Sequence, residues 1–308
     1  MHAPASSNPA LHPQSKAWPV AALLLGNVAL AFGPWFVRLS DVGPVAAAFW
    51  RLALAVPVLL GVAIATSGGS IAAQARGLWG VLVLSGFAFA ADLGAWHAGI
   101  HHTQLANATL FGNAATFIFP IYGFVVARAW PSRTQGVALG MAAVGAALLM
   151  GRSAQLSADN LLGDLLCLLA GVLYALYFIL MARARVTMAP VPALALSSLM
   201  GVLPLLAGAL LLGERVLPGN WWPLVALAVV SQLIGQGLMI YALGQLSPLI
   251  IGLALLVQPV VAATIGWIGY GERLGPLDFT GAALVAAALV LVRRGAVASG
   301  AAAPQKEA

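Results

Sequence analysis

Charge is scarce along the 308 residues of this chain: charged side chains make up 7% of the sequence and hydrophobic ones 62%. The mean hydropathy of +0.98 excludes an ordinary water-soluble domain of this length. Cys167 is the single cysteine, which excludes an intrachain disulfide. No Gly-x-x-x-x-Gly-Lys segment is present, so the chain itself is not expected to hydrolyse ATP. The composition is that of an integral membrane protein.

Apolar runs of about 17 to 25 residues, the length that crosses a bilayer as a helix, recur about ten times. Polar and apolar side chains do not alternate within these runs, so helices rather than strands are expected. The fold class is therefore an all-α integral membrane protein with about ten transmembrane helices. The predicted spans are residues 17–37, 44–66, 78–99, 104–127, 134–150, 162–183, 192–212, 221–244, 248–270 and 276–294.

The two halves of the chain match each other. Pro120 and Pro259 each fall midway through an apolar run, and the same alignment pairs His102 with Tyr241. If each half has five spans, the halves have opposite orientations in the membrane, which is typical of carriers. We predict two inverted five-helix repeats and divide the chain into a disordered N-terminus at 1–16, a first repeat at 17–152, a linker at 153–161, a second repeat at 162–294 and a disordered tail at 295–308.

The basic residues favour an orientation with both termini in the cytoplasm. In that orientation nine lysines and arginines lie on the cytoplasmic side and four on the outer side, with Arg51 inside a span. The linker at 153–161 is then periplasmic. Because the basic residues are spread along the membrane edges, no nucleic-acid-binding surface is expected.

The mid-span prolines each remove one backbone hydrogen bond and bend a helix. The carbonyls of Thr116 and Leu255 are then left free near mid-membrane. Such carbonyls line a cavity when they face water or substrate. The alternative is that Pro120 and Pro259 only bend their helices for packing.

Arg51 and Asp92 are the two charged residues placed deep within predicted spans. Charges at such depth are costly and mark functional sites by default, and the two form a candidate intramembrane charge pair. The pair either supports the packing of two helices or lets Asp92 carry a proton during transport. The second half has Leu199 at the position of Arg51, so any role of Arg51 belongs to one half only.

Three histidines, His97, His101 and His102, follow Trp96 at the end of the third span. His97 and His101 are four residues apart and share a helix face. However, Ala98 stands where a zinc-protease motif needs its glutamate, and a third ligand is missing. We therefore predict no metal, no cofactor and no catalytic residue, and we do not expect an enzyme.

Neutral polar and aromatic side chains within the spans are predicted to line a central cavity. Hydrogen-bonding groups and aromatic faces without fixed charge suit zwitterions with apolar side chains. Hydrogen bonding between helices is the alternative role for each of these side chains. The predicted substrate-binding residues are Trp96, His97, Asn107, Asn113, Tyr174, Tyr177, Gln232, Gln236, Tyr241 and Gln258.

Two segments carry a family resemblance. They are residues 89–122, FAADLGAWHAGIHHTQLANATLFGNAATFIFPIY, and residues 241–274, YALGQLSPLIIGLALLVQPVVAATIGWIGYGERL. Both segments have an aromatic start, small residues and a mid-helix proline, and the second ends in a Gly-Glu-Arg-Leu turn that the first half lacks. These features resemble the drug/metabolite transporter superfamily, EamA type. Within it, the chain looks most like YddG-type amino-acid exporters.

The resemblance implies a carrier in a bacterial inner membrane that exports aromatic and other large neutral amino acids by alternating access. Efflux of drugs or other small metabolites is the alternative, and a membrane-embedded enzyme or a channel are the other classes considered. The expected partners are a small-molecule substrate and the lipid bilayer. The sequence leaves the oligomeric state open.

Overall fold

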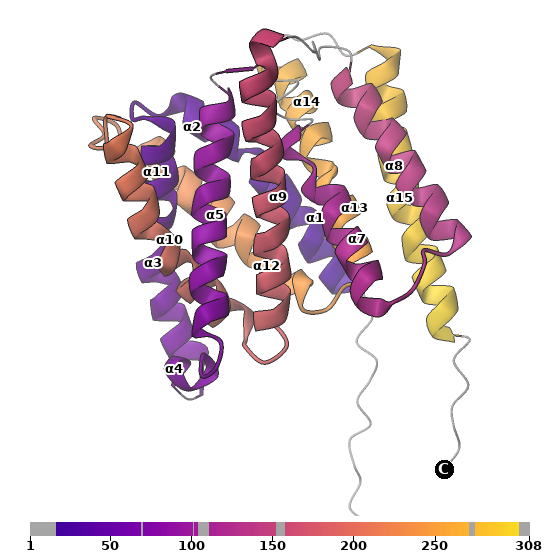
Figure 1. Cartoon of the computed structure of the whole chain (residues 1–308), viewed down its shortest axis with the longest axis horizontal. Helices are drawn as coiled ribbons and strands as arrows, with labels where there is room; N and C mark the ends of the chain where they lie inside the picture. Colours follow the sequence, from indigo (N-terminus) through magenta and orange to yellow (C-terminus); the bar gives the residue numbers. More distant parts are fainter. Residues whose placement is uncertain are drawn as a thin grey trace, which may run out of the picture.

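The computed structural model describes residues 17–68, 70–100, 102–103, 111–151, 158–270 and 275–301. Within these residues every secondary-structure element is a helix, and none is a strand (Figure 1). Asn107 and the Gly-Glu-Arg-Leu turn at 271–274 lie outside the described residues. An all-helical fold is therefore confirmed for the part of the chain that can be described.

The first half of the chain forms α1 (Ala17–Ala31), α2 (Gly33–Leu39), α3 (Pro44–Thr66), α4 (Ile71–Gln74), α5 (Trp79–Ile100), α7 (Ala115–Ala127) and α8 (Arg133–Gly151). The second half forms η1 (Ala158–Asn160), α9 (Leu161–Ala184), α10 (Pro190–Leu211), α11 (Trp222–Ala226), η2 (Leu227–Gln236), α12 (Gly237–Leu243), α13 (Pro248–Leu255), α14 (Val257–Tyr270) and α15 (Pro276–Ala301). The short η1 is a 3₁₀-helix, and η2 is a π-helix.

Seven helical stretches within the described ranges are long and apolar enough to cross a membrane. Three shorter apolar helices, Ala115–Ala127, Arg133–Leu149 and Pro276–Val292, lie where the fourth, fifth and tenth spans are predicted. The chain is thus a multi-pass membrane protein. The seven long stretches are Ala17–Leu39, Pro44–Thr66, Trp79–Gly99, Ala158–Ala184, Pro190–Leu211, Trp222–Leu243 and Pro248–Ile265.

Prolines mark where several of these helices begin. Pro44, Pro190 and Pro248 are the first residues of α3, α10 and α13. The proline ring presets the helical φ angle, and the missing N–H has no partner to lose in the first turn. These prolines therefore set the ends of the loops that connect the spans.

The predicted span at 248–270 is broken rather than only bent. α13 ends at Leu255 and α14 begins at Val257. Pro259 has no N–H to donate to the carbonyl of Leu255. The N–H of Leu256 donates to Leu253 O at 3.2 Å, three residues back, so the last turn of α13 is tighter than an α-helical turn. The break places Gln258 at the start of a new helix.

The helices pair across the two halves of the chain. α3 packs on α10, α5 on α9, α7 on α13, α8 on α15, and α1 on η2 and α12. α8 and α15 lie side by side at one edge of the bundle (Figure 1). Each of these contacts joins a helix before residue 152 to a helix after residue 157, so the two halves do not form separate units.

Glycines permit the closest of these helix crossings. A Cβ atom added to Gly145 would lie 2.8 Å from Gly281 O on the facing helix, so α8 and α15 approach each other there. The Gly-x-x-x-Gly pair of Gly136 and Gly140 has no heavy atom within 4 Å of such a Cβ position. A small-residue motif is therefore present in α8, but a different glycine makes the contact within the chain.

Candidate functional site

A polar network lies inside the bundle where α3, α10 and η2 meet. Arg51 on α3 donates from Nε to Gln232 Oε1 at 2.9 Å, and Gln232 Nε2 donates to Ser198 Oγ at 3.0 Å. Gln232 and Ser198 are buried, whereas Arg51 is partly exposed. Both side-chain groups of Gln232 are thus satisfied by residues from two other helices, which fixes its orientation.

Aromatic rings cover one side of this network. The guanidinium carbon of Arg51 lies 5.4 Å from the centre of the Phe89 ring, a distance at which a cation is attracted to the ring face. Phe89 in turn stacks on Tyr177 with 4.6 Å between ring centres, and Tyr177 lies parallel to Tyr174 at 6.1 Å. We call Arg51, Phe89, Tyr174, Tyr177, Ser198, Gln232 and Gln236 the central cluster.

Gln236 connects the rings to the π-helix. Its Nε2 donates to Tyr177 OH at 3.1 Å, while its buried Oε1 has no hydrogen-bond partner among the described residues. Gln232 and Gln236 both belong to η2, whose ten residues replace the ordinary α-helix expected over 221–244. π-helical segments are rare and concentrate at functional sites. The central cluster therefore includes a buried acceptor without a partner among the described residues, Gln236 Oε1, on a π-helix.

Arg51 and Asp92 both lie between helices, but they do not form the predicted contact pair. No N···O distance of 4.0 Å or less joins them among the ion pairs of the described residues. Asp92 nevertheless lies three residues after Phe89 on α5, about one helical turn from the ring that Arg51 covers. Gln232 and Phe89 hold the guanidinium in place of the carboxylate.

The other predicted site residues lie in three separate places. Gln258 donates from Nε2 to Asn27 Oδ1 at 2.9 Å, which links α14 to α1. Tyr241 follows Ile240 in α12, and the Ile240 carbonyl accepts a hydrogen bond from Arg185 Nε at 3.0 Å. Among the described residues, the hydrogen bonds at these two places go to groups outside the central cluster, so the ten predicted residues do not form a single site.

Trp96 and His97 form the third place, near the end of α5. Their rings meet edge to face with 5.1 Å between centres, and His97 is buried with Nδ1 2.6 Å from Leu93 O. Asn113 lies partly buried in the turn before α7. Asn107, predicted on the same side, is outside the described residues.

The mid-span proline of α7 contacts another helix closely. A Cβ at Gly252 would lie 2.5 Å from Pro120 Cγ and 2.6 Å from Thr116 O. The Thr116 carbonyl is therefore covered by α13. This geometry favours the packing role of Pro120 over the cavity-lining role.

An apolar cavity of about 320 Å³ lies among α1, α13, α14 and α15. Its walls include Leu23, Leu24, Ile250, Val257 and Leu289, and all of its lining residues are Ala, Val, Leu or Ile. Such a lining offers contact surface but no hydrogen bond. The predicted polar residues do not contribute to it, so the polar chemistry and this cavity are in different parts of the bundle.

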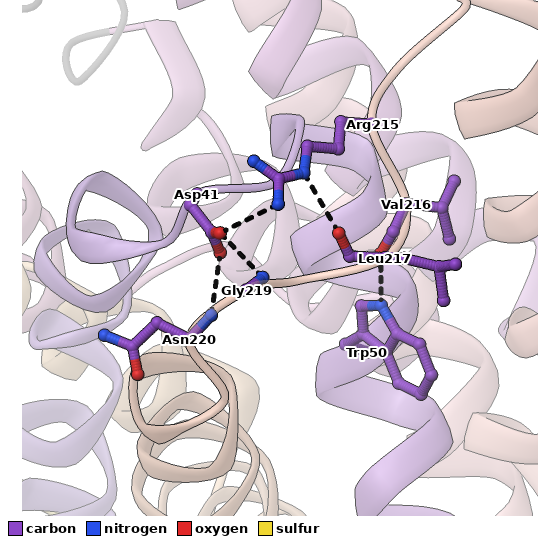
Figure 2. Close-up of polar contacts among 7 residues, drawn as sticks. All are labelled: Asp41, Trp50, Arg215, Val216, Leu217, Gly219 and Asn220. Atoms are coloured by element: carbon purple, nitrogen blue, oxygen red, sulfur yellow. Dashed lines mark hydrogen bonds and ion pairs between the residues drawn. The ribbon is translucent and has the colours of Figure 1, made fainter.

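A second polar network joins the two halves at the loop end that carries α2 and α11, drawn at the top of Figure 1. Asp41 Oδ2 accepts the Gly219 N–H at 2.7 Å and lies 3.3 Å from Arg215 Nη2, and Trp50 Nε1 donates to Val216 O at 2.8 Å (Figure 2). The Gly219 N–H holds the pKa of the Asp41 carboxyl below its usual value.

Glu214 completes this network, which we call the loop clamp: Asp41, Trp50, Glu214, Arg215 and Gly219. The Glu214 carboxylate accepts the N–H groups of Val45 at 3.2 Å and Ala46 at 2.8 Å, in the first turn of α3. These N–H groups have no partner within their own helix, and the helix dipole favours a negative charge there. Gly43, which has no side chain, leaves the space that Glu214 occupies.

Sequence reasoning missed Phe89, Ser198 and Glu214. Phe89 stands three residues before Asp92 on one helix face, which is a usable signal. Ser198 and Glu214 gave no such signal, because their partners are distant in the sequence: Gln232 for Ser198, and Val45 and Ala46 for Glu214.

Comparison with known proteins gives a family for the second half. Residues 161–294 match the EamA-like transporter family. A solved structure titled "Crystal structure of protein" has a TM-score of 0.73 with 14% sequence identity, over 89% of this chain and 94% of that chain. That likeness shows a shared fold. The search of curated proteins gave no match.

Residues 161–294 are therefore similar to a family of transporters, in line with the resemblance of residues 241–274. Members of the matched family are transporters, which agrees with the prediction that the chain is not an enzyme. The match does not distinguish an amino-acid exporter from a transporter of other small metabolites.

Proposed function

We propose that this protein exports aromatic and other large neutral amino acids across a bacterial inner membrane by alternating access, with both termini in the cytoplasm. The central cluster carries the proposal. It combines a cation, two amides and three aromatic rings inside a membrane-spanning bundle. Polar groups at this depth are costly to bury and are found where a solute passes.

The pairing of helices supports two inverted five-helix repeats. In such repeats α3 corresponds to α10, α7 to α13 and α8 to α15, and each of these helices packs on its own counterpart. Likewise α1 corresponds to α9, and α5 corresponds to η2 with α12. The contact of α5 with α9 is therefore equivalent to the contact of α1 with η2 and α12. This is the pattern that a two-fold axis in the membrane plane produces. In this proposal the three shorter apolar helices also cross the membrane, which would bring the number of spans to ten.

Efflux of drugs or other small metabolites is the second candidate function. The family match is equally consistent with it. The apolar cavity of about 320 Å³ favours it, because an apolar solute has no hydrogen bonds to water to lose when it binds there. A membrane-embedded enzyme remains the third alternative.

Uptake of labelled phenylalanine into proteoliposomes that contain the purified full chain tests the proposal. Saturable uptake without a pH gradient is expected for a facilitator. Uptake that needs an imposed gradient would make Asp92 the leading proton carrier. If phenylalanine is not taken up in either condition, while an apolar dye is, the efflux alternative replaces the amino-acid assignment.

A further inference from the structure

Arg51 uses only a small part of its hydrogen-bonding capacity. A guanidinium has five N–H donors, and the single one at Nε is bonded to Gln232. The four N–H groups at Nη1 and Nη2 have no partner among the described residues. Arg51 is also not fully covered by its neighbours. Two parallel N–H groups with this freedom match the two oxygens of a carboxylate.

Asp92 supplies the opposite charge in the same region. It follows Phe89 by three residues on α5, so it lies about one helical turn from the ring that Arg51 covers. The Asp92 side chain is partly buried, and no ion pair of 4.0 Å or less joins it to Arg51 among the described residues. The cation and the anion therefore share one region without contacting each other.

Two opposite charges inside a membrane normally close on each other, because each alone is costly to hold there. Here Gln232 and Phe89 hold the cation away from the anion. A solute with its own carboxylate and ammonium groups would satisfy both charges at once. A solute with only one charge would leave the other without a partner.

We propose that Arg51 and Asp92 are the two poles of a binding site for zwitterionic solutes. Arg51 bonds to the carboxylate, Asp92 accepts from the ammonium, and the rings of Phe89, Tyr174 and Tyr177 contact the apolar side chain. This inference rests on the proposed function and assigns the residues that recognise the two charged groups of the substrate. It assigns recognition of the carboxylate to the first half of the chain, because the second half has Leu199 at the position of Arg51.

Three probes with the same ring separate the poles. Phenylalanine has both charges, phenylalaninamide lacks the carboxylate, and hydrocinnamate lacks the ammonium. Each competes with labelled phenylalanine for binding to the purified full chain in detergent and for exchange in proteoliposomes. In the wild type, phenylalanine is expected to compete at least about tenfold better than either analogue.

Two variants should each remove one preference of the binding site, either for the carboxylate or for the ammonium of phenylalanine. Arg51→Gln is expected to weaken phenylalanine about tenfold, to the level of phenylalaninamide, while the amide itself is unchanged. Asp92→Asn is expected to weaken phenylalanine about tenfold, to the level of hydrocinnamate, while hydrocinnamate itself is unchanged. Arg51→Lys keeps the cation and should keep the preference for a carboxylate. Arg76→Gln, at an exposed loop arginine, is the matched control and should behave as the wild type.

A purely structural role for Arg51 would weaken all three probes alike, and that result would overturn the site. So would equal competition by phenylalanine and its amide in the wild type, or no binding of phenylalanine at all. Phenylalanine binding that depends on Arg51, but without exchange in proteoliposomes, would support the site and contradict only the proposed transport.

Discussion

The interior of the bundle and its loop end hold arginines in opposite surroundings. Arg215, in the loop clamp, has a side chain that is 61% exposed and lies 3.3 Å from Asp41. Arg51, between helices, contacts an uncharged amide and a ring instead of an acid. An exposed ion pair contributes little because water and salt screen it. A charge inside a membrane bundle is costly to leave without an acid, so Arg51 needs a reason other than stability.

Replacing Gly252 by leucine should break the interior most severely. Its Cβ position lies 2.5 Å from Pro120 and 2.6 Å from the Thr116 carbonyl, so α7 and α13 would have to separate. We expect a loss of about 3 kcal/mol in the free energy of unfolding, at the upper end for overpacked sites. The measurement is the yield of monodisperse protein and its unfolding temperature in detergent.

Gly136→Leu is the matched control for that change, since nothing lies within 4 Å of its Cβ position. It should leave yield and unfolding temperature as in the wild type. Equal losses from the two leucines would show that α7 and α13 do not pack as described.

Gln232→Leu should come next in size. It removes the acceptor for Arg51 Nε and the donor to Ser198 at once. Leaving these groups unsatisfied is expected to cost about 2 kcal/mol in unfolding free energy and to slow phenylalanine exchange at least about tenfold. Unfolding temperature and exchange rate are measured together. Gln245→Leu, at an exposed position, is the control; similar exchange by both variants would remove Gln232 from the site.

Glu214→Ala tests the loop clamp. The N–H groups of Val45 and Ala46 would lose their acceptor, which for a helix cap costs about 1 kcal/mol. Glu214→Gln keeps an acceptor oxygen and should lose less. The unfolding temperatures of both variants decide the point, and an alanine variant as stable as the glutamine variant would show that capping contributes nothing.

Acidification tests Asp41 in the loop clamp and should have the smallest effect. The pKa of Asp41 is lowered by the Gly219 N–H, so its stabilising contribution is present above the unfolded-state pKa and is lost as pH falls through the folded-state pKa. Between about pH 5 and 8 the wild type and Asp41→Asn should respond to pH alike. Below about pH 4 only the wild type should lose this contribution.

Unfolding temperature as a function of pH measures this difference. A difference between the wild type and Asp41→Asn that appears above neutral pH would mean that a group other than the Asp41 carboxyl is responsible.

The polar residues show where prediction from the sequence stops. Arg51, Asp92, Tyr174, Tyr177, Gln232 and Gln236 could be selected one by one, because a polar group within an apolar run is unusual wherever the helix later packs. Their partners could not be. Arg51 and Gln232 are 181 residues apart, and their contact depends on how α3 and η2 are rotated about their axes. The same limit explains why Tyr241 and Gln258 were grouped with residues that they do not contact.

That this chain crosses a membrane as helices, and roughly where, could be predicted from local sequence, because the free energy of placing a residue in lipid depends mainly on that residue and its near neighbours. The helix starts at Pro44, Pro190 and Pro248 are local in the same way, because each proline constrains its own backbone. Four features depend on contacts between distant segments: the break at Leu256, the π-helix around Gln232, the capping of α3 by Glu214 and the separation of Arg51 from Asp92. Each of these depends on which helices meet and at what rotation, and that is set by the packing of the whole bundle.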